Sequence, residues 1–193
     1  MRTITTLFTL ICLAAGLQAQ TNWALDKSHT GIKFTTTHML ISEVEGQFDD
    51  FAGTVTSTSE DFNGAAVEFS AKTASINTSN ERRDGHLKGE DFFDAEKYPE
   101  IKFVGKIVKK GKKYFLEGDF TMKATTKPVK FDVAYNGTIS GSRGKKAGFK
   151  ITGVVNRFDY GLAWSSAMEA GGLVVGEDIT ITCNVELNEV VAK

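Results

Sequence analysis

The sequence has few cysteines, which cross-link small folds, and few prolines, which end helices and strands. Only two cysteines and two prolines occur among its 193 residues. Cys12 lies in an apolar N-terminal run, so removal of that run leaves Cys183 without an intramolecular partner. A disulfide framework is therefore excluded, and the chain must build a hydrophobic core. Its length suggests a single domain.

An excess of charge of one sign is also lacking. The chain has 23 Lys and Arg against 24 Asp and Glu, a formal net charge of −1, so the balance indicates neither a nucleic acid nor an anionic membrane as partner. Its three histidines show none of the close spacings of common metal sites. There is no nucleophile elbow and no phosphate-binding glycine loop. These absences leave few signals for an enzyme.

The first 19 residues have the form of a secretory signal. Arg2 precedes the almost uncharged, apolar run Ile4–Leu17, and Ala19 offers a small residue before a cut. The run is too short for a membrane span of about 20 residues. We expect residues 1–19 to be a signal peptide and residues 20–193 to form the exported domain. That domain would be periplasmic in a bacterium with two membranes and otherwise secreted.

Period-two alternation of apolar and polar residues runs through the rest of the chain and predicts β-strands. Gly46 and Gly53 predict bends within one of them. The strand count, the short turns and the glycines inside strands favour an all-β, up-and-down barrel over a sandwich. About eight long strands are expected, at residues 32–38, 44–55, 67–72, 101–107, 114–122, 129–136, 149–155 and 179–187.

Residues 78–95 interrupt the strands with charged and aromatic side chains. Thr78 and Glu81 have the spacing of a capping box, which predicts a helix with Thr78 as its N-cap. Gly85 and Gly89 limit that helix to one or two turns. The segment is therefore expected to be a short helical crossover, and loops of this kind often carry function.

The apolar faces of the strands supply most of the candidate ligand-binding residues. Gly105, Gly118 and Gly153 lie on the same faces, and rings that alternate with missing side chains can leave an elongated void suited to an alkyl or prenyl chain. The same alternation also fills a tapering barrel, so a ligand cavity and a filled core both stay open. The candidates are Phe34, His38, Phe48, Phe69, Phe103, Leu116, Phe120, Phe131, Tyr135, Phe149 and Ile151. Cys183 shares the apolar face of the last strand and is expected to be a small buried hydrophobe.

Two groups of cations are candidates for holding a polar head group. The first lies in the crossover, and the second is Arg157, whose register in its strand predicts an inward side chain. Pairing of these cations with nearby carboxylates is the alternative, with Asp159 or Asp84 as partner of Arg157. The candidates in the crossover are Arg82, Arg83 and His86, with Lys88 beside them.

Several motifs, in this order along the chain, resemble those of the YceI-like family, which are polyisoprenoid-binding, lipocalin-like exported proteins. The similarity covers nearly all of residues 20–193. Two departures, Ala124 and Phe158, affect turn or rim detail. The motifs are WALDKSH at 23–29, RDGHLK at 83–88 with DFFD at 91–94, TTKPV at 125–129 and NRFDYG at 156–161.

The resemblance implies an extended, eight-stranded antiparallel lipocalin-like barrel with an internal apolar tunnel for an isoprenoid or another long-chain amphiphilic lipid. It implies binding, transport or storage with no established catalysis, often in a homodimer. Beside the resemblance, we expect no cofactor and a transient contact with a membrane. One rival interpretation is a metal-dependent hydrolase that uses His29, His38 and His86 with Asp26 or Asp84. A third is a filled barrel with a structural or stress-response role.

Overall fold

The structure, a computed structural model, describes residues 20–142, 144–168 and 171–191, so the expected signal peptide lies outside the described residues. No helix in these ranges is long and apolar enough to cross a membrane. The helical elements described are α1 (Glu81–Lys88) and the 3₁₀ turns η1 (Thr73–Ser75) and η2 (Arg157–Tyr160). The strands are β1 (Thr21–Leu25), β2 (Gly31–His38), β3 (Ser42–Phe48), β4 (Phe51–Ser57), β5 (Ala66–Lys72), β6 (Ile76–Asn77), β7 (Glu100–Lys110), β8 (Lys113–Met122), β9 (Thr125–Gly141), β10 (Gly144–Asn156) and β11 (Val175–Glu189).

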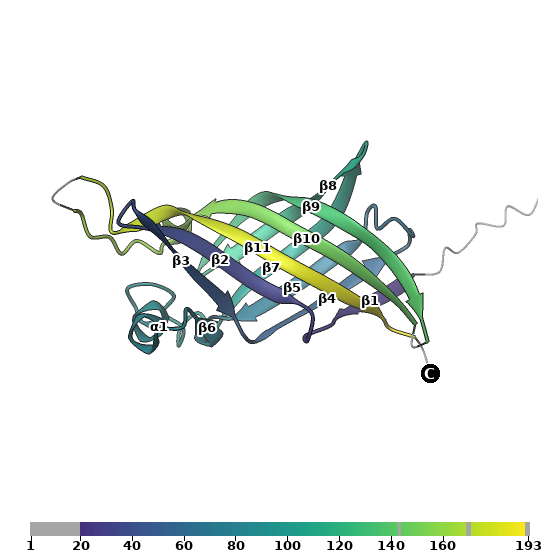
Figure 1. Ribbon diagram of the computed structural model, residues 1–193, viewed down its shortest axis with the longest axis horizontal. Coiled ribbons are helices and arrows are strands. Elements are labelled where there is room, and N and C mark those ends of the chain that lie inside the picture. The colour runs from purple at the N-terminus through teal and green to yellow at the C-terminus, as the bar shows by residue number, and fades with distance from the viewer. Residues whose placement is uncertain (1–19, 143, 169–170, 192–193) are drawn as a thin grey trace, which may run out of the picture.

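The long strands close into a barrel because β11 returns to the start of the chain. The order β1-β4-β5-β7-β8-β9-β10-β11 is closed by a further pairing of β1 with β11, which makes a ring of eight strands. β2 and β3 continue the sheet from the same edge of β11, and β6 pairs with β3. Figure 1 shows the strands crossing obliquely around an elongated body. The predicted all-β antiparallel barrel is confirmed.

One predicted strand is divided in two, and one short strand was not predicted. The unpredicted strand is β1, which lies with β2 along the same edge of β11, on either side of a turn at residues 26–30. The predicted strand 44–55 is broken at Asp49 and Asp50, because the Asp49 N–H donates instead to Ser75 O at 3.1 Å. The prediction of bends at Gly46 and Gly53 is therefore wrong. Both glycines are paired within strands, and the break in the strand lies between them.

Inward glycines mark places where an aromatic ring lies against the barrel wall. A Cβ added at Gly105 or Gly118 would lie 2.7 or 2.8 Å from Phe103 Cζ, and one at Gly153 would overlap the Phe131 ring. Non-bonded carbons prefer about 3.5–4.0 Å, so each ring occupies the space that a side chain would need. The glycines thus admit large rings to the interior and do not by themselves leave a void.

An aromatic cluster closes one end of the barrel. The loop between β4 and β5 turns inward at Phe62, which has a φ of +59° and is 1% exposed. Its ring centroid lies 5.0 Å from those of Trp23 and Phe149 and 5.6 Å from that of Tyr135. A bulky residue at positive φ is strained, and burial of this large ring among others offsets that strain.

The crossover covers the other end of the barrel. α1 begins at Glu81, and its N-cap is Asn80, whose side chain accepts a hydrogen bond from the Arg83 N–H at 3.0 Å. The prediction of Thr78 as N-cap is therefore wrong. Thr78 is buried, and its N–H and hydroxyl both donate to Asp84 Oδ1. The side chain of Asp84 thus ties the helix to the segment that precedes it.

We expect Gly105→Ala to destabilise the protein by about 1–3 kcal/mol, because the new methyl would overlap the backbone of Glu117 and approach Gly118 Cα to 2.7 Å. Urea unfolding measures the change. Gly31→Ala is the control, since only Lys33 Cε comes within 4.0 Å of the added atom. The control should change stability by no more than about 0.5 kcal/mol. Equal losses in the two variants would contradict the close-packing role of Gly105.

Candidate functional site

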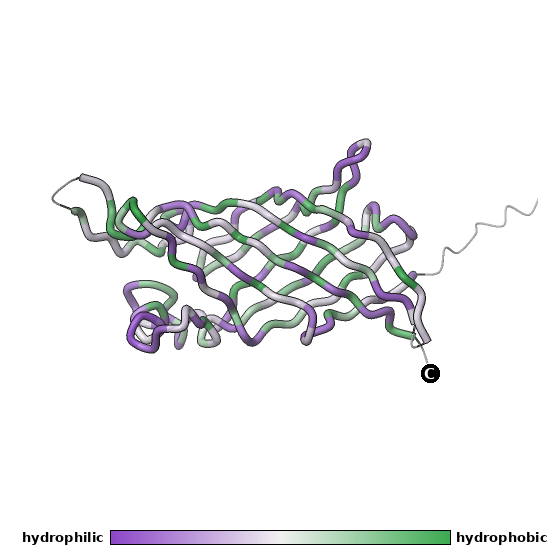
Figure 2. Tube along the Cα trace, viewed as in Figure 1, coloured by the Kyte–Doolittle hydropathy of each residue, from purple (hydrophilic) through white to green (hydrophobic). Residues whose placement is uncertain are grey.

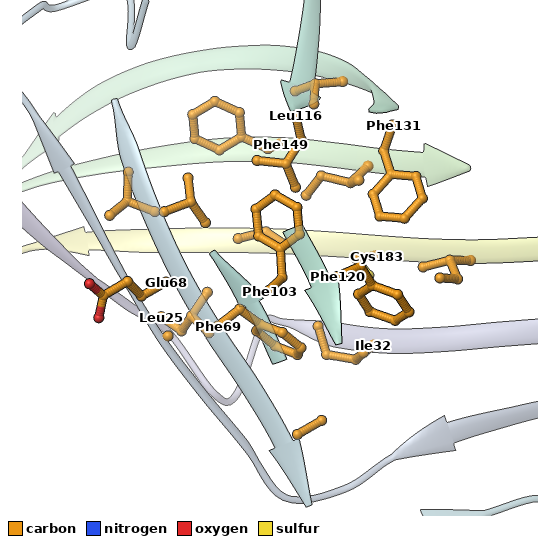
Figure 3. Close-up of a pocket in the computed structure, with 18 of the residues that line it drawn as sticks. Leu25, Ile32, Glu68, Phe69, Phe103, Leu116, Phe120, Phe131, Phe149 and Cys183 are labelled. Atoms are coloured by element: carbon orange, nitrogen blue, oxygen red, sulfur yellow. The ribbon is translucent and has the colours of Figure 1, made fainter. Parts of the chain in front are cut away.

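The barrel encloses an apolar cavity of about 140 Å³. Its wall is built from the inward residues of strands all around the ring and of β2 and β3. Among the described residues that line it, those with charged or hydroxyl side chains are Lys33, Thr54 and Glu68. Figure 3 shows the Glu68 carboxylate directed away from the rings of Phe69 and Phe103. The interior is therefore a dry space that favours hydrocarbon over any polar group.

The volume of the cavity limits what fits without rearrangement. At about 10–15 Å³ for each water that a cavity of this measure holds, the space corresponds to about ten waters, or a chain of about ten carbon atoms. Phenylalanine rings make much of the wall, and a longer chain requires some of them to change rotamer.

Nine of the residues predicted to bind a ligand line this cavity. They come from β2, β3, β5, β7, β8, β9 and β10, which shows that period-two alternation identified the inward faces correctly. These nine residues are Phe34, Phe48, Phe69, Phe103, Leu116, Phe120, Phe131, Phe149 and Ile151.

The sequence prediction missed the contribution of β11. Ile181, Cys183, Val185 and Leu187 all line the cavity. Their alternation was recognised as a strand signal, and the same signal was sufficient to place them on the inward face. Leu25 was also missed, because β1 is too short to show a clear period.

Cys183 faces the cavity and not bulk solvent. Burial raises the pKa of its thiol to about 12, from an ordinary value of 9.0. The thiol is the nucleophile only when ionised, so this cysteine is inert at neutral pH. The expectation of a small apolar residue on the inward face agrees with its position among the lining side chains.

Two predicted residues lie away from the cavity wall. Tyr135 belongs to the aromatic cluster at the closed end, where its hydroxyl is 2.7 Å from Thr138 Oγ1 and its ring stacks 5.0 Å from Phe149. His38 ends β2 and pairs with Ser42 and Val175, beyond the part of β2 that lines the cavity. The prediction that both residues share the inward ligand surface is corrected, because the strands carry them past its two ends.

The crossover cations do not line the cavity either. Arg83 donates from Nε to Thr78 Oγ1 at 2.7 Å and from a terminal nitrogen to Thr78 O at 2.8 Å. His86 Nε2 lies 2.9 Å from Asp91 Oδ2, and its ring packs edge-on against Trp164. Arg82 is exposed. Arg83 and His86 are therefore paired within the protein and do not hold a head group. His86 pairs with a carboxylate as expected, whereas Arg83 binds a hydroxyl and a carbonyl in place of a carboxylate.

Arg157 is 1% exposed and is used entirely for structure. Its guanidinium donates to the backbone carbonyls of Gly176, Val175, Leu162 and Trp164 at 2.6–3.1 Å. The predicted inward orientation is right, but the predicted pairing with Asp159 or Asp84 is wrong. Burial lowers the pKa of this arginine, and the charge of Glu177 opposes that shift. Arg157 thus holds the segment that follows η2 against the start of β11.

The histidines proposed for a metal site do not meet. Within the described residues, the one group of potential ligands that converges is Asp26, His29 and Glu186. Lys146 Nζ lies 3.1 Å from Asp26 Oδ2 and 2.5 Å from Glu186 Oε1, so an ammonium already occupies the centre of this group. Hydrogen bonds from His29 and Lys146 hold the pKa of Asp26 well below its usual range. The cluster ties the bulge before β2 to β10 and β11.

The raised pKa of Cys183 predicts a pH dependence of stability. Unfolded protein releases the thiol proton from about pH 9, whereas folded protein retains it up to about pH 12. The free energy of unfolding therefore falls as pH rises through this interval, and Cys183→Ala should remove that part of the decline. Lysines titrate in the same range, so the difference between the two proteins in urea unfolding is the relevant quantity. Identical pH profiles would contradict the buried thiol.

We expect Arg157→Met to destabilise the protein by about 2–4 kcal/mol, since it leaves buried carbonyls without their charged donor. Urea unfolding and limited proteolysis of residues 161–176 measure the effect. The control is Arg82→Met, an exposed position, with an expected change within about 0.5 kcal/mol. A loss of ligand from Arg157→Met at unchanged stability would contradict the structural role.

Comparison with known proteins agrees with this geometry. UPF0312 protein SAS2572 of Staphylococcus aureus strain MSSA476 is 36% identical over 172 residues, which cover 87% of this chain and 98% of the relative. The crystal structure of the Campylobacter jejuni YceI protein is similar with a TM-score of 0.69 and 31% identity, covering 86% of this chain and 97% of that one.

A polyisoprenoid binding domain from Saccharophagus degradans shares the fold, with a TM-score of 0.65 at 13% identity over 87% of this chain and 98% of that one. The model of the YceI-like domain matches residues 23–187, which span the closed ring and the cavity described above. This protein therefore belongs to the YceI-like family.

Proposed function

We propose that this protein binds an isoprenoid or another long-chain amphiphilic lipid inside the barrel and carries or stores it without catalysis. The observation that supports this most directly is the enclosed cavity, whose wall is almost wholly apolar. Such a wall gains free energy from any hydrocarbon chain that leaves water, by about 0.8 kcal/mol for each buried CH₂. The binding domain of Saccharophagus degradans, which has the same fold, supports the isoprenoid class.

The polar end of the ligand is proposed to lie near Thr54 and Glu68. These residues are directly paired on β4 and β5, and their side chains point outward. A hollow on the outer surface is lined by both of them and also by Gly53, Phe69 and Phe103, all of which line the inner cavity as well. The barrel wall is therefore thin at Gly53, where the same residues line the apolar interior and the outer hollow.

The hydrogen-bonded pairing of the strands is also interrupted close to this thin part of the wall. The pairing of β1 with β4 stops at Ala24, and that of β2 with β3 starts at Lys33. Across the gap, Lys27 Nζ lies 3.6 Å from Asp50 Oδ1, and both side chains are largely exposed. An exposed pair of this kind contributes at most about 1 kcal/mol. Between these pairings, the exposed Lys27–Asp50 pair adds little to hold the neighbouring strands together.

The setting of this activity follows from the N-terminal segment. A secretory signal at residues 1–19 would place the domain outside the cytoplasm, in the periplasm of a bacterium with two membranes or otherwise in the medium. There it would meet lipids released from a membrane. A homodimer is the proposed assembly, because the resemblance to the YceI-like family implies it. Sedimentation of the purified domain would measure this directly.

The test of the proposal is mass spectrometry of organic extracts from purified protein. We expect a long-chain lipid in the extract, or uptake of added prenyl or fatty chains by protein that was purified empty. A filled barrel with a structural role predicts neither result. Repeated absence of lipid together with failure of uptake would therefore overturn the proposal.

Filling the cavity should remove the ligand. Cys183→Phe places a ring among the lining residues, and we expect the lipid content to fall at least tenfold, which corresponds to about 1.4 kcal/mol of binding free energy. Val154→Phe is the control, because Val154 is 58% exposed on the outer face of β10. Circular dichroism checks folding, and Val185→Phe replaces the first variant if that one does not fold. Equal lipid content in the cavity-filled and control variants would contradict the assigned site.

A further inference from the structure

The turn between β2 and β3 exposes three consecutive large apolar side chains. Met39 is 44% exposed, Leu40 65% and Ile41 86%. Figure 2 shows this turn as a strongly hydrophobic segment near one end of the long axis. Scattered apolar residues on a surface need no explanation, but three adjacent ones at a protruding tip do.

The backbone of this turn makes its sequence more unusual. Met39 and Leu40 have φ values of +52° and +61°. Hairpin turns with two such residues normally use asparagine, aspartate or glycine, since bulky side chains are strained there. A purely structural turn would therefore favour small polar residues both for its conformation and for its exposure to water. The turn nevertheless has large apolar residues, although they are unfavourable both for its backbone conformation and for its exposure to water. This indicates that these residues have a functional role.

A second segment supports the tip from the side. The Met39 N–H donates to Val174 O at 2.9 Å, and the Val174 N–H donates to Ser166 O at 2.9 Å. A Cβ added at Gly172 would lie 3.0 Å from Leu40 Cδ1 and 3.5 Å from Met168 Cε, so these two side chains converge over that glycine. The apolar tip is thus composite and is held in place by hydrogen bonds.

The size of the tip decides which kind of partner fits it. The three exposed side chains present an apolar area on the order of 200 Å², at about 100 Å² for each fully exposed aliphatic side chain. This is about a quarter of the roughly 800 Å² that each partner contributes to a stable protein interface. The area is sufficient for shallow, reversible insertion among lipid chains. In Figure 1 the turn lies near one end of the long axis, where the loop between η2 and β11 extends further, so both segments would face a flat surface at this end.

The charges near the tip do not indicate attraction to anionic lipid. The charged residues that follow it in β3 are Glu43 and Glu45, both exposed, and no lysine or arginine occurs between Lys33 and Lys72. Insertion therefore depends on apolar contact alone. A neutral phosphatidylcholine surface should be sufficient, and the attachment should be insensitive to salt.

We propose that the Met39–Ile41 turn inserts into the surface of a lipid bilayer, so that the barrel docks by this end while it takes up or delivers its ligand. This inference rests on the proposed function, because a bilayer is the natural source of a long-chain lipid. It adds a docking surface that is separate from the cavity residues.

Flotation with phosphatidylcholine vesicles tests the docking directly. The variant L40D/I41D should reduce the vesicle-bound fraction at least tenfold relative to the unmodified protein. Ile139→Asp is the matched control, since Ile139 is 68% exposed on β9, away from the tip, and its replacement should leave binding unchanged. In addition, the fluorescence of Leu40→Trp should be quenched by brominated phosphatidylcholine. Equal flotation of all three proteins, or no quenching, would overturn the proposal.

Two further measurements separate docking from lipid binding and from self-association. The tip variant should take up fluorescent fatty acid from vesicles at least tenfold more slowly, while its content after loading from ethanol stays unchanged. If neither the tip variant nor the unmodified protein takes up lipid from vesicles or from ethanol, the proposed function is wrong. The flotation experiment still tests whether the turn docks on a bilayer. If L40D/I41D changes the solution mass from dimer to monomer and the unmodified protein does not float, the tip is an interface between copies, which overturns the inference.

Discussion

The barrel depends on its last strand, because β11 hydrogen-bonds to three others. Its residues 178–188 pair with β10, residues 175–184 with β2 and residues 187–189 with β1. The ring can close only when the end of the chain reaches its beginning, which requires contacts of the largest sequence separation. β11 also supplies Ile181, Cys183 and Val185 to the cavity wall. Closure of the sheet and formation of the binding space are therefore one event.

The size of the cavity depends on how aromatic rings fill the space beside the inward glycines. Phe103 lies over Gly105 and Gly118, and Phe131 lies over Gly153, so space without a side chain is filled from a neighbouring position. The cavity that remains is about 140 Å³, less than a long isoprenoid needs. Side-chain rings can change rotamer more readily than backbone can move, so a longer ligand of the proposed kind would require the rings, and not the strands, to rearrange.

The conspicuous charges of the chain stabilise the ends of the barrel and do not line the cavity. Arg157 satisfies four carbonyls next to η2, Arg83 satisfies Thr78 before α1, and Lys146 joins Asp26 to Glu186. Each occurs where the chain leaves regular strand pairing, because backbone and carboxylate groups there need partners. The charged residues of these motifs thus make structural contacts, while the wall of the cavity consists mostly of apolar residues outside the motifs.

The sequence by itself determined the strands, the inward faces and nine of the cavity residues, because a two-residue period places every second side chain on one side of a sheet. The motifs around residues 83–94 and 156–161 were sufficient to identify the family. Only the tertiary structure decided where each alternating segment stops lining the interior. It placed Tyr135 in the aromatic cluster at the closed end and divided the predicted strand 44–55 at Asp49. It also directed the guanidinium of Arg157 to backbone carbonyls. These outcomes depend on partners distant in sequence, such as Phe62 for Tyr135, and no local pattern specifies such partners.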